Sequence, residues 1–129
     1  MKEDVNLKIK TFRDLKAWQE GHALVLMVYN ASERLPSCER FELCSQMRRS
    51  AISITSNIAE GFGRQTYKEK IQFYYIALGS LTELQNQLIV TKDTGRLGEL
   101  NFKEIYDKSV EVHKIINGLI KKSKTYLNS

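Results

Sequence analysis

The sequence predicts an all-α protein that folds as an antiparallel up-down-up-down four-helix bundle. Apolar residues recur at intervals of three and four along four segments of similar length, which is the period of an amphipathic helix. No segment shows the period-two alternation of a strand. Short breaks separate the four segments, and helices joined by short loops pack antiparallel to their neighbours.

We expect the first helix over about residues 14–35, ended by Pro36. His22 lies within its apolar stripe, so we expect a packed histidine that hydrogen-bonds internally rather than a ligand or a base. The stripe consists of residues that step by three and four: Leu15, Trp18, His22, Val25, Tyr29 and Ser32.

We expect the second helix over about residues 40–60, ended by Gly61 and Gly63, since glycine accepts the left-handed conformation that closes helices. The side opposite its main stripe carries small polar residues, which would let another helix approach closely. Four more residues widen the apolar arc to about half of the helix circumference: Cys44, Ile52, Thr55 and Ala59. The main stripe is Leu43, Met47, Ala51, Ile54 and Ile58.

The third helix is expected over about residues 66–92, with Thr66 and Glu69 as a capping box, and the fourth over about 101–124, with Asn101 and Glu104 in the same roles. The apolar arcs of the second and third helices are wider than a four-helix core needs, which predicts burial between subunits. The third helix offers Ile71, Phe73, Tyr74, Tyr75, Ala77, Leu78, Leu81, Leu84 and Leu88; the fourth offers Ile105, Val112, Ile116, Leu119 and Ile120.

The chain has the length of one domain, residues 1–129, and its 42% hydrophobic residues can form a core. No apolar run approaches about 20 residues, and the first residues lack the apolar region of a secretory signal. We therefore expect a cytoplasmic protein without a membrane partner. The spacing of Cys38 and Cys44 fits no common zinc site, so we expect free thiols.

The motifs of several enzyme classes are absent, and we expect a protein that is not an enzyme. The di-iron sites of helical bundles use Glu-x-x-His pairs, but Glu20 and Glu111 precede His22 and His113 by two positions. Phosphate-binding and nucleophile motifs are missing, and the lone G-x-G of "EGFGR" follows a helix rather than a strand. We expect no metal and no cofactor.

Four polar residues are candidates for a structural network: Arg48, Asn57, Glu60 and Glu83. Arg48 lies within the apolar arc and needs a carboxylate or an aromatic partner, for which Glu83 or Glu60 could serve. Asn57 and Glu60 could hydrogen-bond the following turn. Glu60→Ala would then cost about 1–3 kcal/mol if its partner is buried. The functional alternative is an anion site where Arg64, Lys68 and Lys70 gather at a helix N-terminus.

The formal net charge of +5 suits anionic partners, above all nucleic acid. Lysines also cluster near both chain termini. Phosphate contacts without sequence specificity are one interpretation of this basic surface, and plain solvation is the other. The candidates for phosphate contacts are Arg49, Arg64, Lys68, Lys114 and Lys121.

Three segments together resemble a known family: "FRDLKAWQEGHALVLMVY", "LPSCERFELCSQMRRSAISITSNIAEGFGR" and "YYIALGSLTELQNQL". They are similar to the proteins encoded in intervening sequences of bacterial 23S ribosomal RNA genes, also called S23 ribosomal proteins. The resemblance covers about residues 11–122. Within it, "NIAEGFGR" corresponds to a recurring corner rather than a catalytic loop.

This resemblance implies an antiparallel four-helix bundle that assembles as a homopentamer around a central channel, with no known enzymatic activity. A related branch, the accessory proteins of diversity-generating retroelements, consists of basic pentamers that bind reverse transcriptase and nucleic acid. This chain is less basic than that branch. Two functions stay open: an oligomeric scaffold that binds RNA or DNA, and a protein–protein scaffold that binds no nucleic acid. An enzyme with an unrecognised site between subunits is a third.

Overall fold

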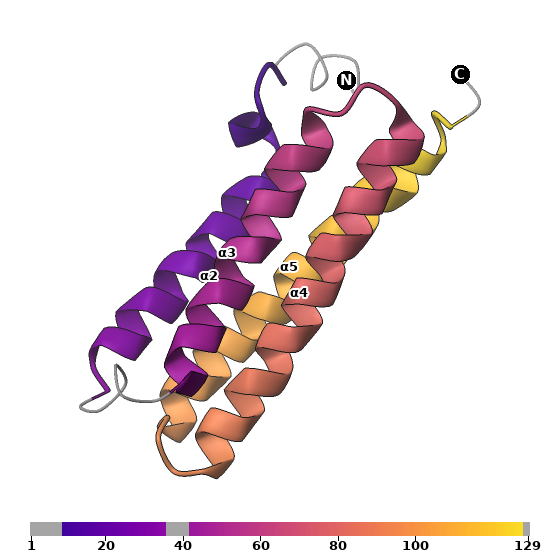
Figure 1. The fold of residues 1–129 in the computed structure, drawn as a ribbon. Helices are drawn as coiled ribbons and strands as arrows, with labels where there is room; N and C mark the ends of the chain where they lie inside the picture. Colours follow the sequence, from indigo (N-terminus) through magenta and orange to yellow (C-terminus); the bar gives the residue numbers. More distant parts are fainter. Residues whose placement is uncertain (1–8, 36–41, 128–129) are drawn as a thin grey trace.

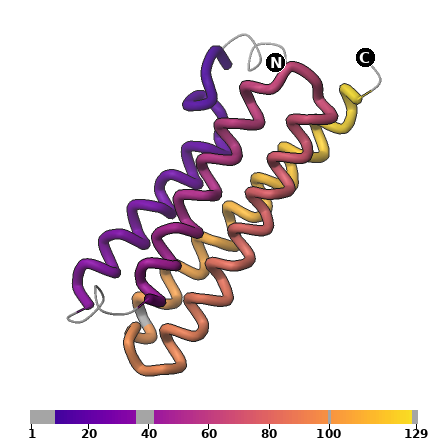
Figure 2. Tube along the Cα trace, viewed as in Figure 1, coloured from indigo at the N-terminus to yellow at the C-terminus, as the bar shows by residue number. Residues whose placement is uncertain are grey.

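The computed structural model describes residues 9–35 and 42–127, apart from the side chain of Leu100. These residues form a short 3-10 helix, η1 (Phe12–Asp14), and the helices α2 (Lys16–Glu33), α3 (Glu42–Phe62), α4 (Tyr67–Asp93) and α5 (Glu99–Lys124). Each of α3 and α5 packs on both α2 and α4. Figures 1 and 2 show the four long helices side by side in alternating directions. The predicted all-α four-helix bundle is therefore confirmed.

The core lies between the four helices and consists mainly of aliphatic side chains. The predicted stripes of the last three helices supply most of it, and two of their predicted members are exposed: Ile52 at 42% and Tyr75 at 47%. Both lie at the edges of arcs that are wider than the core. The largest fully buried apolar residues are Leu24, Val28, Ile54, Ile58, Leu81, Leu84, Leu88, Val112 and Ile116.

Three members of the stripe predicted for the first helix are buried, Leu15, Val25 and Ser32, whereas Trp18, His22 and Tyr29 lie farther out. Small residues, Ala17 and Gly21, face inward together with Leu24 and Val28. A Cβ atom at Gly21 would lie 3.2 Å from the Thr55 Cγ2 atom of α3, so this glycine lets the two helices approach closely. The prediction missed Ala17 and Gly21, because a stripe drawn through large side chains passes over the small residues at which two helices approach closely.

His22 is exposed, and the expectation of a packed, internally hydrogen-bonded histidine is wrong. Its ring stacks on Trp18 with centroids 4.8 Å apart and an angle of 8° between the planes. Phe12 packs edge-on against Trp18, with ring centroids 5.4 Å apart and an angle of 64° between the planes. The three rings tie η1 to the first turns of α2 on the outside of the bundle.

Neither Gly61 nor Gly63 adopts the expected left-handed conformation. In the described part of the chain, the one residue with positive φ is Gly95. α3 continues through Gly61 to Phe62. A Cβ atom at Gly61 would lie 2.8 Å from Tyr74 Cε1 and 2.9 Å from Phe73 Cβ. Gly61 is therefore required for the close contact between α3 and α4.

Two helix starts differ from the prediction, and one agrees with it. Leu15 is extended and separates η1 from α2, which begins two residues later than expected. α5 begins at Glu99 with Gly98 as N-cap, so the cap expected at Asn101 is wrong. Buried Leu97, just before the cap, anchors the entry into α5. Thr66 caps α4 as predicted, since its hydroxyl accepts a hydrogen bond from the Glu69 N–H.

Cys44 is disulfide-bonded, which corrects the expectation of a free thiol at this position. Cys38 lies outside the described residues, as do Pro36 and the expected start of the second helix near residue 40. None of the helices in the described ranges is long and apolar enough to span a membrane.

Candidate functional site

One end of the bundle gathers η1, the start of α2, the end of α3, the start of α4 and the end of α5 (Figures 1 and 2). Three segments meet there, residues 9–16, 60–70 and 120–127, and we call them the basic end. Each segment contributes three basic side chains. The first segment has one carboxylate, the second has two and the third has none. Such an excess of positive charge attracts polyanions.

The carboxylates of the basic end are already engaged or lie at helix termini. Asp14 accepts hydrogen bonds from the backbone N–H groups of Thr11 and Lys10, at 3.0 and 2.8 Å, and these bonds lower the pKa of its carboxyl. Glu60 pairs with Arg64 at 2.8 Å. Glu69 lies in the first turn of α4, where negative charge stabilises a helix.

Three of the five predicted phosphate contacts lie at the basic end: Arg64, Lys68 and Lys121. Lys68 and Lys121 are exposed and form no ion pair with any described residue. Arg64 is less available, because it pairs with Glu60 and its guanidinium lies 4.6 Å from the centroid of the Phe73 ring. A surface of lysines therefore remains for an external anion.

The other two predicted contacts, Arg49 and Lys114, are exposed but lie away from the basic end, within α3 and α5. These two helices are diagonal in the bundle, since each packs on α2 and α4 instead. Their outward faces point in different directions. The five residues therefore do not form one surface in a single chain.

Arg48 is partly buried between α2 and α3. Its Nε donates to the Ser32 hydroxyl at 2.8 Å, and its guanidinium lies 5.0 Å from the centroid of the Tyr29 ring. The aromatic partner was expected, whereas the carboxylate partners suggested for it, Glu83 and Glu60, are not found beside it. A hydroxyl and a π face thus hold this cation next to the core.

The remaining network candidates do not join Arg48. Asn57 donates to the Ser53 carbonyl at 2.8 Å, one turn back in its own helix rather than to the following turn. Glu60 binds the Arg64 side chain. Glu83 is exposed and forms no ion pair or hydrogen bond with the described residues. The four residues therefore take part in separate local contacts.

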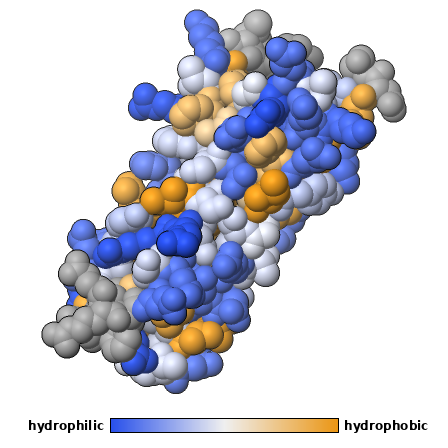
Figure 3. Space-filling view, viewed as in Figure 1, coloured by the Kyte–Doolittle hydropathy of each residue, from blue (hydrophilic) through white to orange (hydrophobic). Residues whose placement is uncertain are grey.

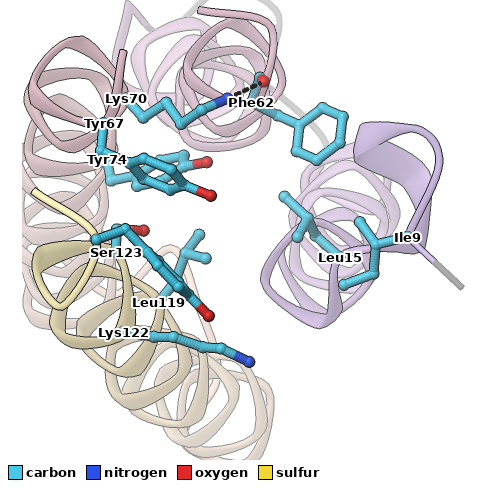
Figure 4. A pocket seen from close by; sticks show the side chains of 10 residues that line it. Ile9, Leu15, Phe62, Tyr67, Lys70, Tyr74, Leu119, Lys122 and Ser123 are labelled. Carbon is cyan, nitrogen blue, oxygen red and sulfur yellow. Dashed lines mark hydrogen bonds between the residues drawn. The ribbon is translucent and has the colours of Figure 1, made fainter. Parts of the chain in front are cut away.

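A cavity of about 370 Å³ opens at the basic end, between the ends of α3 and α5, the start of α4 and the residues before α2 (Figure 4). Ile9, Leu15, Phe62 and Leu119 form its apolar walls. Its other lining residues carry hydrogen-bond donors: Tyr67, Lys70, Tyr74, Lys122, Ser123 and Tyr126. None of the described carboxylates lines this cavity.

Lys70 connects the cavity to the end of α3. Its ammonium group donates to the Phe62 carbonyl at 2.6 Å, drawn as a dashed line in Figure 4. This bond closes α3 with a cation at its C-terminus, where the helix dipole favours positive charge. It also explains why α3 ends without a left-handed glycine. Partial burial lowers the pKa of Lys70.

The lining tyrosines and Ser123 were not predicted as functional candidates. Tyr74 was predicted to lie in the core, and it is indeed 2% exposed. Burial of its ring raises the pKa of the hydroxyl to about 12, so the hydroxyl stays a donor at neutral pH. Periodicity cannot reveal that a core hydroxyl opens into a cavity, because the walls come from segments more than 40 residues apart in the sequence. In the described ranges, no three His, Cys, Asp or Glu side chains group as metal ligands would.

The fold matches a solved structure, described as a protein with unknown function from the S23 ribosomal protein family of Bacteroides thetaiotaomicron VPI-5482. The two chains are 24% identical with a TM-score of 0.76, and the match covers 81% of this chain and 98% of the other. This likeness supports the fold. No curated protein matches the chain.

A family model provides the stronger relation, because it matches most of the chain. The model for the 23S rRNA-intervening sequence protein matches residues 13–118. The matched span includes all of α2, α3 and α4 and most of α5. The resemblance carried by the three quoted segments is thereby confirmed: the chain belongs to the 23S rRNA-intervening sequence protein family.

Proposed function

We propose that the protein is a non-enzymatic, self-associating helical scaffold that binds RNA or DNA through phosphate contacts at the basic end. The observation that carries this proposal is the concentration of basic side chains there, with few carboxylates to neutralise them. Lysines in the last turn of α5 also stabilise that helix. Lys68 has no such role, because it lies in the first turn of α4, where the helix dipole disfavours a cation.

Exposed apolar side chains support self-association. The outward side of α4 carries Tyr75, Ile76, Ile89 and Val90, which are 39–50% exposed. Figure 3 shows one face of the molecule, where apolar side chains form separate patches among polar ones. The exposed residues Leu26 on α2 and Ile52 on α3 offer a second apolar surface on other helices. Contacts between two unlike surfaces generate closed rings, and a homopentamer is the ring that the family resemblance suggests.

A ring would strengthen the proposed binding. Rotation about one axis relates the copies in a cyclic assembly, so every copy has its basic end at the same level along that axis. The basic ends would then form one continuous positive rim. Because phosphate binding depends on the number of charges that contact the strand, repetition around the rim raises affinity without any base contact.

The second candidate function is a protein–protein scaffold that binds no nucleic acid. Leu26 favours it, because this side chain is 56% exposed, more than any other large hydrophobic residue of the described part. A reverse transcriptase is the partner that the retroelement branch of the family suggests. In that case the lysines of the basic end would serve only solvation.

The test is binding of a structured RNA across a salt series, with the oligomer mass measured by light scattering on the same samples. We expect affinity to fall steeply with salt, as counterion release requires. Lys121→Glu should weaken binding and reduce the salt slope by about one or more. Lys114→Glu provides the matched comparison, since it changes an exposed lysine of the same helix away from the basic end. We expect a smaller effect there.

An intact oligomer that binds no RNA and no single-stranded DNA at low salt would exclude the nucleic-acid function and favour the protein scaffold. Equal losses from Lys121→Glu and Lys114→Glu would show that binding is not concentrated at the basic end. If light scattering finds a monomer at every concentration, the proposed positive rim of an oligomer is wrong.

A further inference from the structure

The cavity of the basic end combines two kinds of wall. Ile9, Leu15 and Leu119 present apolar surface, and polar groups of α4 and α5 lie across from Ile9 and Leu15 in Figure 4. Its volume of about 370 Å³ lies in the range of small-molecule sites. Such sites typically pair an apolar lining with a few convergent polar groups. The phosphate contacts proposed above do not require such a pocket.

Two hydroxyl groups in this cavity lack partners. Tyr74 is 2% exposed and Ser123 is 4% exposed, yet neither hydroxyl forms a hydrogen bond with any described residue. In Figure 4 the Tyr74 hydroxyl points into the open space between the walls. Both hydroxyl oxygens are accessible from the cavity, because the one fully enclosed side-chain N or O atom without a partner in the described part of the chain is Gln87 Oε1. Each hydroxyl can therefore donate a hydrogen bond to a ligand in the cavity, in place of water.

Two ammonium groups in the same cavity lack counterions. Lys70 and Lys122 are partly buried, and neither forms an ion pair with a described carboxylate. Lys70 donates one of its three N–H groups to the Phe62 carbonyl, and the other two remain able to donate to a ligand. Among the described residues, the side chains of the cavity therefore offer two positive charges, several donors and no negative charge. This set fits an anionic group that accepts several hydrogen bonds.

We propose that this cavity binds a small amphipathic organic anion. Its anionic group would accept hydrogen bonds from the Lys122 ammonium and the hydroxyls of Tyr74 and Ser123. Its apolar body would lie against Leu15 and Leu119. A carboxylate and a phosphate monoester share this acceptor chemistry, and the size of the apolar walls requires a hydrocarbon or aromatic body on either.

Calorimetric titration with octanoate tests the proposal on the full chain. We expect one site per chain. Octanol has the same body without the charge, and acetate has the charge without the body, so each should bind at least about tenfold more weakly. Octyl phosphate in a parallel titration identifies which anionic group the site prefers.

Three variants test whether octanoate occupies this cavity. Lys122→Met keeps the apolar stem and removes the charge, and Tyr74→Phe removes one hydroxyl without changing the packing of the ring. Each should weaken octanoate binding, with about a tenfold loss for Lys122→Met. Lys103→Met is the matched control, because Lys103 lies on the same helix at the far end and binds Asp107 at 2.9 Å. It should leave the affinity unchanged.

Folding is checked separately by thermal unfolding without ligand. Tyr74→Phe should be as stable as the unchanged protein, since the lost hydroxyl forms no hydrogen bond within the described chain. Octanoate should raise the melting temperature of the unchanged protein and raise that of Lys122→Met less.

Absence of octanoate and octyl phosphate binding would overturn the proposal and leave water as the occupant of the cavity. Equal affinities for octanoate and octanol, or equal affinities of Lys122→Met and Lys103→Met, would also overturn it. The outcome is independent of the nucleic-acid proposal. If octanoate binds and RNA does not, only the nucleic-acid proposal fails. If RNA binds and octanoate and octyl phosphate do not, only the proposal for the cavity fails.

Discussion

The two ends of the bundle close their helices by different means. At the basic end, α3 stops where the Lys70 ammonium group binds the Phe62 carbonyl. At the opposite end, α4 stops in a backbone turn: Arg96 N–H binds the Thr91 carbonyl at 3.0 Å, and Gly95 N–H binds the Lys92 carbonyl at 2.9 Å. Gly95 has the positive φ of 79° that this turn requires.

The charges of the two ends differ as well. Residues 33–35, 42 and 92–104, which we call the balanced end, contribute four basic and five acidic side chains. The balanced end shows that this bundle can close without any excess of cations. The surplus of basic side chains at the basic end therefore exceeds what closing the helices requires, although Lys70 closes α3 and the last lysines of α5 stabilise that helix. This is the physical reason for placing function there.

The largest effect that separates the two ends is expected from Gly61→Ala. The new methyl group would lie 2.8 Å from Tyr74 Cε1 and 3.1 Å from the Lys70 carbonyl oxygen, so α3 and α4 would have to separate at the basic end. We expect a loss of about 1–3 kcal/mol in the free energy of unfolding, measured by chemical denaturation. The matched control is Gly118→Ala in α5, where nothing lies within 4 Å of the new methyl group. It should raise stability by up to about 1 kcal/mol.

Gly95→Ala tests the balanced end and should have the next largest effect. No atom crowds this position, so any loss comes from the positive φ alone. We expect about 1–2 kcal/mol by the same denaturation measurement. Gly95→Asn should lose less, because asparagine tolerates the left-handed region better than alanine. Equal stability of the alanine variant and the unchanged protein would contradict the backbone turn described for this end.

These two glycines also show what the sequence could and could not predict. Glycine near the end of a predicted helix suggested a left-handed cap, and the same reasoning would fit Gly61 and Gly95 equally well. The difference between them is tertiary: Gly61 faces Phe73 and Tyr74 of the next helix, and Gly95 faces solvent. The periodicity of the local sequence predicted the four long helices correctly. It does not indicate how closely two helices approach each other.

The candidate site was predictable only in part for the same reason. The excess of basic residues in the sequence indicated an anionic partner, and Lys68 and Lys121 do lie at the basic end. The separation of Arg49 from Lys114 depends on α3 and α5 being diagonal, which periodicity does not reveal. The cavity combines Leu15 with Ser123 across more than 100 residues of sequence. No local pattern could have placed these two side chains opposite each other.

Between the two ends, the ion pair of Glu20 and Lys108 gives a smaller effect that depends on pH. A hydrogen bond between the two groups lowers the pKa of the Glu20 carboxyl and raises that of the Lys108 ammonium. The Glu20 contribution is present above its ordinary pKa of 4.5 and is lost as pH falls through the lower folded value. The Lys108 contribution is present below 10.5 and is lost as pH rises through the higher folded value.

The same pair should therefore contribute a constant amount, on the order of 0.5–1 kcal/mol, between about pH 5 and pH 10. Unfolding of Lys108→Met across this range should be uniformly easier, and the differences from the unchanged protein should shrink below about pH 4. A difference that grows on acidification would contradict the assignment of the pair.

The smallest stability effect is expected from Glu60→Ala at the basic end. Its partner Arg64 is 41% exposed and Glu60 itself is 53% exposed, so the pair is a surface contact between successive helical turns. Such pairs contribute about 0.3–0.5 kcal/mol. This revises the loss of 1–3 kcal/mol expected for a buried partner, and denaturation should resolve the two values.

The substitution also removes a negative charge from the basic end and releases Arg64. If the basic end binds RNA, Glu60→Ala should therefore bind it more tightly than the unchanged protein at low salt, although its stability hardly changes. Weaker binding at unchanged stability would assign Glu60 a direct role in recognition and contradict a purely electrostatic basic end.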